Sequence, residues 1–186
     1  MRSLLFILLF YSICSEAKVN ITENNVFYSV NAKTKETLLT TINNATPIRE
    51  DGEVFHGHTK WNINWRFWWK SNSSQCRINK VEASLILTLT MPKLVSTDEQ
   101  VKQVWSNWYP NLLTHEIGHI NLAKATIKEI EKSLLAIPTQ SSCQRLEQTA
   151  NTLAQQKMTE LSKASKKYDR ETNHGESQGA WLYMHL

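Results

Sequence analysis

Two segments of alternating apolar and polar residues limit the first half of this chain to β-structure. A period of two places every second side chain on one face of a half-buried strand. The apolar sets are Trp61, Ile63 and Trp65 in the first segment and Val81, Ala83, Leu85, Leu87 and Leu89 in the second. Because the turn-forming run Ser71–Ser74 separates them, we expect an antiparallel hairpin over residues 54–69 and 77–90, ended by Pro92. Before it the sequence predicts a strand at residues 26–30 and a small helix at 34–43.

The second half of the chain predicts helices. Ser96–Glu99 has the capping-box pattern and starts a helix through Trp105. Pro110 suits the first turn of a second helix that continues to about Leu135, and Ser141–Gln144 caps a third that ends near Lys166. Strands followed by helices indicate a single α+β domain, with an N-terminal antiparallel sheet. Its parts are 18–95 mainly strands, 96–167 mainly helices and 168–186 an irregular tail.

Residues 1–17 are predicted to be a secretory signal peptide. Arg2 supplies a positive charge, and the apolar run Leu4–Ile13 is too short to span a bilayer. Ser15–Ala17 has small residues where signal peptidase cleaves, so we expect a protein exported to the periplasm or the medium. Lipoprotein processing at Cys14 is the alternative, although Ile13 is bulky for that site. The rest of the sequence contains no apolar run long enough to span a bilayer, so no transmembrane segment is expected in the mature form.

The charge and the cysteines limit the partners. A net charge of +4 with scattered lysines argues against a nucleic-acid-binding protein. After cleavage Cys76 and Cys143 remain, an even number in an oxidising compartment, and we expect a disulfide between a strand and a helix. Two unrelated buried thiols are the alternative. Neither cysteine has the close cysteine or histidine neighbour usual in structural zinc sites.

The pentapeptide His115-Glu116-Ile117-Gly118-His119 carries the chemistry. Its two histidines are four residues apart in a predicted amphipathic helix, so both imidazoles project from one face. Zinc binds imidazole nitrogens, and the carboxylate of Glu116 can take a proton from a metal-activated water. The sequence therefore predicts a zinc site with Glu116 as general base, in a zincin-like bundle of about three helices.

A third protein ligand is needed, and the sequence leaves several candidates. Glu129 and Glu131 lie about 15 Å or more along the helix axis from His119, which is too far. The tail concentrates titratable groups in residues 168–175. His174 is the predicted third ligand, with Asp169 and Glu171 as alternatives.

Other polar and aromatic residues near these motifs have less specific signals. Tyr168 is a candidate donor to the oxyanion of a tetrahedral intermediate, or a partly buried aromatic. His56 and His58 share one strand face and are either an exposed pair or metal ligands. His185 is not expected to take part in the site. The clustered residues Trp61, Trp65, Trp68 and Trp69 form either the core face of a sheet, which we favour, or a platform for glycans or peptides.

Several of these motifs together resemble the bacterial domain of unknown function 922 family, whose members are described as predicted secreted zinc-dependent proteases. The resemblance covers nearly the whole mature chain. It includes Phe27–Val30, Glu36–Leu39, Trp61–Trp65, Cys76, Leu89–Pro92, Trp108, the His115–His119 motif, Cys143 and the Tyr168–Gly175 tail. It implies His115 and His119 as ligands, Glu116 as catalytic acid/base and a disulfide between the two cysteines, and it supports His174.

We therefore expect a secreted or periplasmic zinc hydrolase, a peptidase whose partner is a protein or peptide substrate. A cell-wall peptide amidase with the same metal chemistry is one alternative. A non-catalytic, zinc-containing surface-binding domain is another. The sequence contains no pattern that indicates an oligomer.

Overall fold

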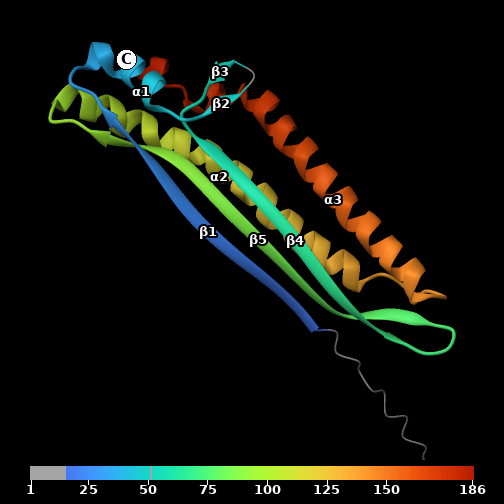
Figure 1. The fold of residues 1–186 in the computed structure, drawn as a ribbon. Coiled ribbons are helices and arrows are strands. Elements are labelled where there is room, and N and C mark those ends of the chain that lie inside the picture. The colour runs from blue at the N-terminus through green and yellow to red at the C-terminus, as the bar shows by residue number, and fades with distance from the viewer. Residues whose placement is uncertain (1–15, 51) are drawn as a thin grey trace, which may run out of the picture.

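A computed structural model describes residues 16–50 and 52–186 and shows one long sheet with helices packed against one face (Figure 1). The sheet contains β1 (Glu16–Asn31), β4 (His58–Ser71) and β5 (Cys76–Val95). The helices are α1 (Lys35–Ala45), α2 (Glu99–Leu135) and α3 (Cys143–Thr172). The short elements are β2 (Arg49–Glu50), β3 (Glu53–Val54) and the 3-10 turns η1 (Glu176–Gln178) and η2 (Leu182–His185). The α+β prediction is confirmed.

The sheet is mixed, whereas the sequence predicted an antiparallel one. β4 and β5 form the predicted antiparallel hairpin, but β1 pairs in parallel with β5, giving the order β1-β5-β4. β5 has the longest apolar alternation and takes the central position, which is the most buried place in a sheet. β5 also continues past Pro92. Its pairing with β4 ends at Thr90, so at Pro92 it has β1 as its sheet neighbour, and proline is tolerated where one side of a strand is open.

The core lies between the inner face of the sheet and α2 and α3. Val81, Ala83, Leu85 and Leu87 of β5 are buried there, as the alternation predicted. Trp61 and Trp65 are partly buried against the same core, which supports the core interpretation for these two. Trp68 and Trp69 are 42% and 40% exposed, so the core interpretation does not extend to them.

A single helix, α2, replaces the two helices predicted around Pro110. The Asp98 side chain caps its start by accepting a hydrogen bond from the Val101 backbone N–H at 2.9 Å. Pro110 lies inside the helix and removes one backbone hydrogen bond. Trp108 and Leu112, on either side of it, are buried in one cluster with α1. Packing on both sides therefore holds the helix continuous through the proline.

Helix α3 continues beyond the predicted end at Lys166 and includes the first part of the predicted irregular tail. Asn173 and His174, with φ of 47° and 50°, take the left-handed conformation that ends it. The His174 backbone N–H donates to the Asp169 carbonyl at 2.7 Å. This extension places Tyr168 and Asp169 on a helix beside α2.

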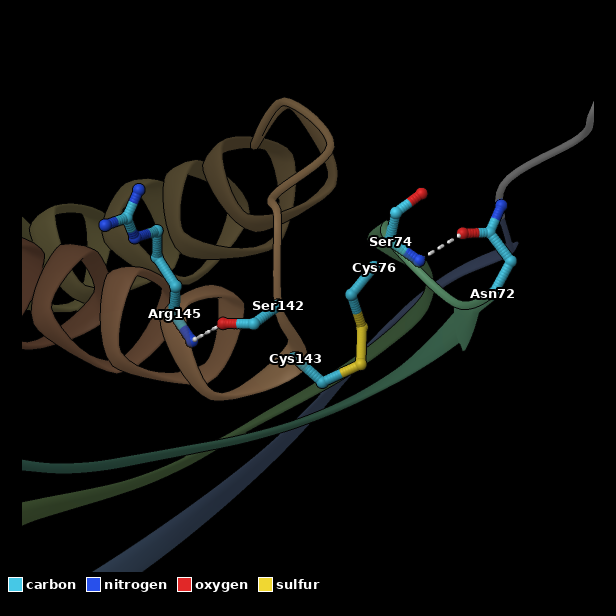
Figure 2. Close-up of a disulfide and its surroundings, with 6 residues drawn as sticks. All are labelled: Asn72, Ser74, Cys76, Ser142, Cys143 and Arg145. Atoms are coloured by element: carbon cyan, nitrogen blue, oxygen red, sulfur yellow. Dashed lines mark hydrogen bonds between the residues drawn. A yellow bond between two sulfur atoms is a disulfide. The ribbon is translucent and has the colours of Figure 1, made fainter.

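The predicted disulfide between Cys76 and Cys143 is present and joins the start of β5 to the start of α3 (Figure 2). Ser142 caps α3 beside it by accepting a hydrogen bond from the Arg145 backbone N–H at 3.2 Å. Backbone hydrogen bonds of 2.8 Å in both directions also link Cys76 to Gln140. The hairpin and the helical layer are thus tied together at this end.

Replacing both cysteines with serine should lower the free energy of unfolding by about 4 kcal/mol, because the bridge closes a loop with a sequence separation of 67. Urea unfolding of the double variant and of the oxidised wild type measures the difference. Reduced wild type serves as the control and should match the variant. Equal stability of all three would contradict a structural role for the bridge.

The predicted signal peptide falls mainly on residues 1–15, outside the described residues. Glu16 and Ala17, at its predicted end, begin β1. Within residues 16–50 and 52–186, no helix is both long enough and apolar enough to cross a bilayer.

Candidate metal centre

Two histidines of α2 lie at the centre of the site, and one ring nitrogen of each is in hydrogen-bond contact with a neighbouring side chain. His115 and His119 face α3 from adjacent turns of α2, and His115 is buried. His115 Nδ1 lies 2.9 Å from Gln178 Oε1, and His119 Nδ1 lies 2.9 Å from Ser165 Oγ. Such contacts fix the orientation of a metal-binding imidazole and leave its Nε2 for the ion.

Both free nitrogens converge on one carboxylate, that of Asp169. Its Oδ1 lies 3.5 Å from His115 Nε2 and 3.0 Å from His119 Nε2. The three ligand atoms lie within 4.8 Å of one another. The structure therefore brings Asp169, an alternative in the sequence analysis, together with the two histidines, and it does not bring the preferred His174 into this group.

The charges of this group fit a cation. Burial raises the pKa of Asp169, but hydrogen bonds with His115 and His119 outweigh burial and hold that pKa well below its usual range. Burial likewise lowers the pKa of His115, and its hydrogen bonds with Asp169 and Gln178 outweigh burial and raise it. Gln178 Nε2 donates to Tyr168 Oη at 3.0 Å, so its Oε1 is left to accept from His115 Nδ1. Without a metal, the raised pKa favours a proton on His115 Nε2 facing the carboxylate. A divalent cation would replace that proton and leave a neutral His115 with its Nε2 lone pair directed at the ion.

Glu116, next to the first histidine, is buried at the wall of the same cavity. Its Oε2 accepts a hydrogen bond from Thr59 Oγ1 at 2.8 Å. A Cβ on Gly57 would lie 2.7 Å from Oε1, so a glycine is needed for the carboxylate to approach this backbone. Burial is the largest influence on the pKa of Glu116 and raises it, against the lowering effect of the Thr59 hydrogen bond. A raised pKa is a property of carboxylates that exchange protons near neutral pH.

Tyr168 packs behind the histidines. Its ring stacks on His115 with a centroid distance of 5.1 Å and meets His119 edge-on at 5.0 Å. Its hydroxyl donates to the His115 carbonyl at 3.3 Å and contacts Gln178. Tyr168 is not among the residues that line the cavity. This position fits the partly buried aromatic of the sequence analysis better than a donor to an oxyanion.

Gly118→Ala should lower the free energy of unfolding by about 1–3 kcal/mol, although alanine is the better helix former by about 1 kcal/mol. A Cβ on Gly118 would lie 2.3 Å from Cζ and Oη of Tyr168, a rigid ring held on both sides. Urea unfolding measures the loss, and Asn121→Ala, an exposed site on the same helix, is the control that should gain stability. In a Tyr168→Ala background the Gly118 substitution should cost little. A stabilised Gly118→Ala would contradict the packing.

The remaining sequence candidates lie outside the ligand group, and among Glu171, His174 and His185 the cavity is lined by His174. His174 lines the cavity with its ring 5.5 Å from that of Phe55, and its carbonyl accepts from Trp181 Nε1 at 2.9 Å. Glu171 is exposed and pairs with Lys167 at 3.5 Å. His185 Nε2 lies 2.8 Å from the Gly179 carbonyl.

The two early histidines also border the cavity. His56 Nε2 lies 2.7 Å from Asn43 Oδ1, and burial lowers the pKa of His56 to about 4, so its ring is neutral at pH 7. His58 Nε2 lies 3.2 Å from Glu50 Oε1. In the described residues the metal-compatible group contains neither of them.

Sequence reasoning missed the residues that orient the two histidines, Gln178 and Ser165, and the residue that holds the Glu116 carboxylate, Thr59. Gly175 was within the tail motif, but its role was not predicted. A Cβ there would lie 3.0 Å from Cγ of His115, and its φ of 84° is in the left-handed region that favours glycine. The helical spacing from Ser165 to Asp169 was a signal that could have placed both on one face of α3.

The cavity in front of these side chains has a volume of about 420 Å³. Its walls come from β2, β3, the start of β4, α2, α3 and the C-terminal segment. Apolar residues form part of its wall, among them Ile48, Val54, Phe55, Leu112, Ala180 and Trp181. The charged groups at the wall are Glu50, Lys60 and Lys166 besides the centre itself. A site of this size and composition suits an organic ligand with apolar side groups.

The fold and the site define an α+β domain with a candidate metal centre of two histidines and one aspartate. A family model described as "Bacterial protein of unknown function (DUF922)" matches residues 25–175, and the chain belongs to this family. Comparisons with curated proteins and with solved structures found no match. The resemblance is thus confirmed at the level of the family, whose description assigns no activity.

Proposed function

We propose that this protein is an exported zinc-dependent hydrolase that cleaves amide bonds in proteins or peptides. The observation that carries the proposal is the convergence of His115 Nε2, His119 Nε2 and an Asp169 oxygen beside the buried carboxylate of Glu116. Two imidazoles and one carboxylate are a donor set of catalytic zinc sites, which keep a further position open. The same donors also serve non-haem iron proteins. Glu116 as an adjacent base favours hydrolysis.

Each residue of the centre has a role in this proposal. Bound zinc would supply Lewis acidity and lower the pKa of water. Glu116 takes the proton of the attacking water on its carboxylate and returns it to the leaving nitrogen. Thr59 holds Oε2 of Glu116, so Oε1 is the oxygen left to accept this proton. Gln178 and Ser165 keep the two imidazoles oriented.

The proposal assigns no oxyanion contact to Tyr168, because its hydroxyl is engaged behind His115. His174 and His58 both line the cavity and can donate a hydrogen bond to bound substrate. The apolar wall around Phe55 and Trp181 favours substrates with apolar side chains near the cleaved bond.

A hydrolysis assay with and without a chelator tests this function. The zinc-loaded protein should cleave casein or members of a peptide library, and removal of the metal should abolish cleavage, with recovery on adding zinc back. A parallel digest of peptidoglycan identifies the amidase alternative by released muropeptides. Absence of cleavage on every substrate, in a sample that retains its metal, would leave a non-catalytic binding domain and refute the hydrolase.

A further inference from the structure

The far end of the β4–β5 hairpin has a cationic face that the fold does not require. We define the basic hairpin face as Arg66, Trp68, Lys70, Arg77 and Lys80. Arg77 lies between the buried residues Cys76 and Ile78, so it points away from the core, and Lys70 is its cross-strand partner on the same side. Trp68 pairs with Lys80, whose ammonium lies 4.9 Å from the centroid of the Trp68 ring. Four of the 21 lysines and arginines of the sequence thus lie on one surface.

This arrangement costs folding stability. Like charges directly opposite each other in a sheet repel, and Lys70 faces Arg77 across the strands. Between residues 66 and 81 the hairpin has no acidic residue. Glu82, the nearest carboxylate further along β5, pairs with Lys80 at 2.8 Å and is the cross-strand partner of Arg66. Trp68 exposes 42% of its surface at the centre of the cations. Cations around an exposed indole match a surface that is both anionic and partly apolar.

The start of β1 lies at the same end of the molecule (Figure 1). Glu16 is in register with Lys80. The chain N-terminal to Glu16 contains the apolar run Leu4–Ile13, a composition that prefers lipid to water. Until the predicted cleavage removes this run, it joins the described domain at Glu16, next to the basic hairpin face.

From these observations we propose that the basic hairpin face docks on an anionic phospholipid membrane. Lysine and arginine side chains near such a surface are attracted to its charge, and tryptophan favours the boundary between headgroups and hydrocarbon. The disulfide and the Cys76–Gln140 hydrogen bonds fix the hairpin to the helical layer, so docking orients the whole domain. The cavity at the start of β4 lies about 40 Å along the strand from Lys70, at 3.3 Å per strand residue. Docking through the basic hairpin face would therefore leave the cavity free of the membrane contact.

Vesicle flotation of the exported protein, with its N-terminal residue determined, tests the proposal. The vesicles contain equal parts of phosphatidylglycerol and phosphatidylcholine, or phosphatidylcholine alone. The wild type should bind the anionic vesicles and not the neutral ones. Lys70→Gln with Arg77→Gln should weaken binding about 25-fold, at about five-fold per cation, and should leave stability unchanged or higher because a repulsion is removed.

The matched control is Lys33→Gln with Lys93→Gln, which removes two exposed cations at the other end of the sheet and should leave binding unchanged. Trp68→Ala should weaken vesicle binding even at high salt, without affecting binding to dextran sulfate, a soluble polyanion. Equal binding by wild type and the Lys70/Arg77 variant would overturn the proposal. Binding to the polyanion without binding to anionic vesicles would overturn it as well and indicate an anionic glycan as the partner.

Discussion

Replacing Asp169 with alanine should lower zinc affinity by at least 100-fold, one of the two largest effects we expect in this molecule. The substitution removes the oxygen on which both Nε2 atoms converge. Even residues that only orient metal ligands typically contribute 10–100-fold to affinity, so loss of a ligand should exceed that range. Competition with a chromophoric chelator measures the affinity, and circular dichroism checks that the helices persist.

The matched control is His174→Ala. Its ring lines the same cavity and follows Asp169 closely in sequence, but it lies outside the ligand group. This variant should keep wild-type zinc stoichiometry. If His174→Ala lost zinc and Asp169→Ala retained it, the third ligand would be the one first predicted from sequence, and the arrangement of the centre described above would be wrong.

The second large effect is expected from Glu116→Gln, which should reduce kcat by about 10²–10⁴-fold and leave zinc bound. Glutamine preserves the size of the side chain and can still accept a hydrogen bond from Thr59, but it cannot take a proton. Hydrolysis of the best peptide found in the library, together with zinc content, measures both quantities. Asp169→Ala should instead lose metal and activity together.

Thr59→Val is a useful companion, because it removes the hydrogen bond to Oε2 of Glu116 at nearly constant volume. We expect a smaller loss of kcat, since the carboxylate remains but is held less firmly. Full activity of Glu116→Gln would exclude Glu116 as the general base, whatever the metal.

Much of this fold follows from patterns that repeat along the chain. The alternation in residues 81–89 correctly assigned the inner face of β5, and the cysteine count correctly paired Cys76 with Cys143. The four-residue spacing of His115 and His119 placed both on one face of a helix. These signals are local, and each depends on the geometry of one element.

What the sequence did not predict depends on contacts between elements. The parallel pairing of β1 with β5 is a choice of neighbour that the alternation of β1 does not encode. Helix α2 continues through Pro110 because Trp108 and Leu112 are both buried. A prediction that ends helices at proline therefore divides α2 into two helices.

The third ligand was missed for a related reason. The apolar face of α3 ends after Leu161, and the inward positions that follow are polar, among them Ser165, Asp169 and Thr172. A search for apolar periodicity therefore ends the helix early and leaves Asp169 in an irregular tail. Without the helix, no spacing distinguished Asp169 from His174. Polar residues at helical spacing after the apolar stripe were the sequence signal that α3 contributes a ligand to this centre.

The most direct test of the metal centre is X-ray absorption at the zinc edge of the metal-loaded protein, compared with His174→Ala. We expect two imidazole nitrogens at about 2.0–2.1 Å and a carboxylate oxygen at about 2.0–2.2 Å, with the same spectrum from the variant. A protein that takes up no zinc, or a third imidazole that disappears from the spectrum of His174→Ala, would contradict the centre of His115, His119 and Asp169.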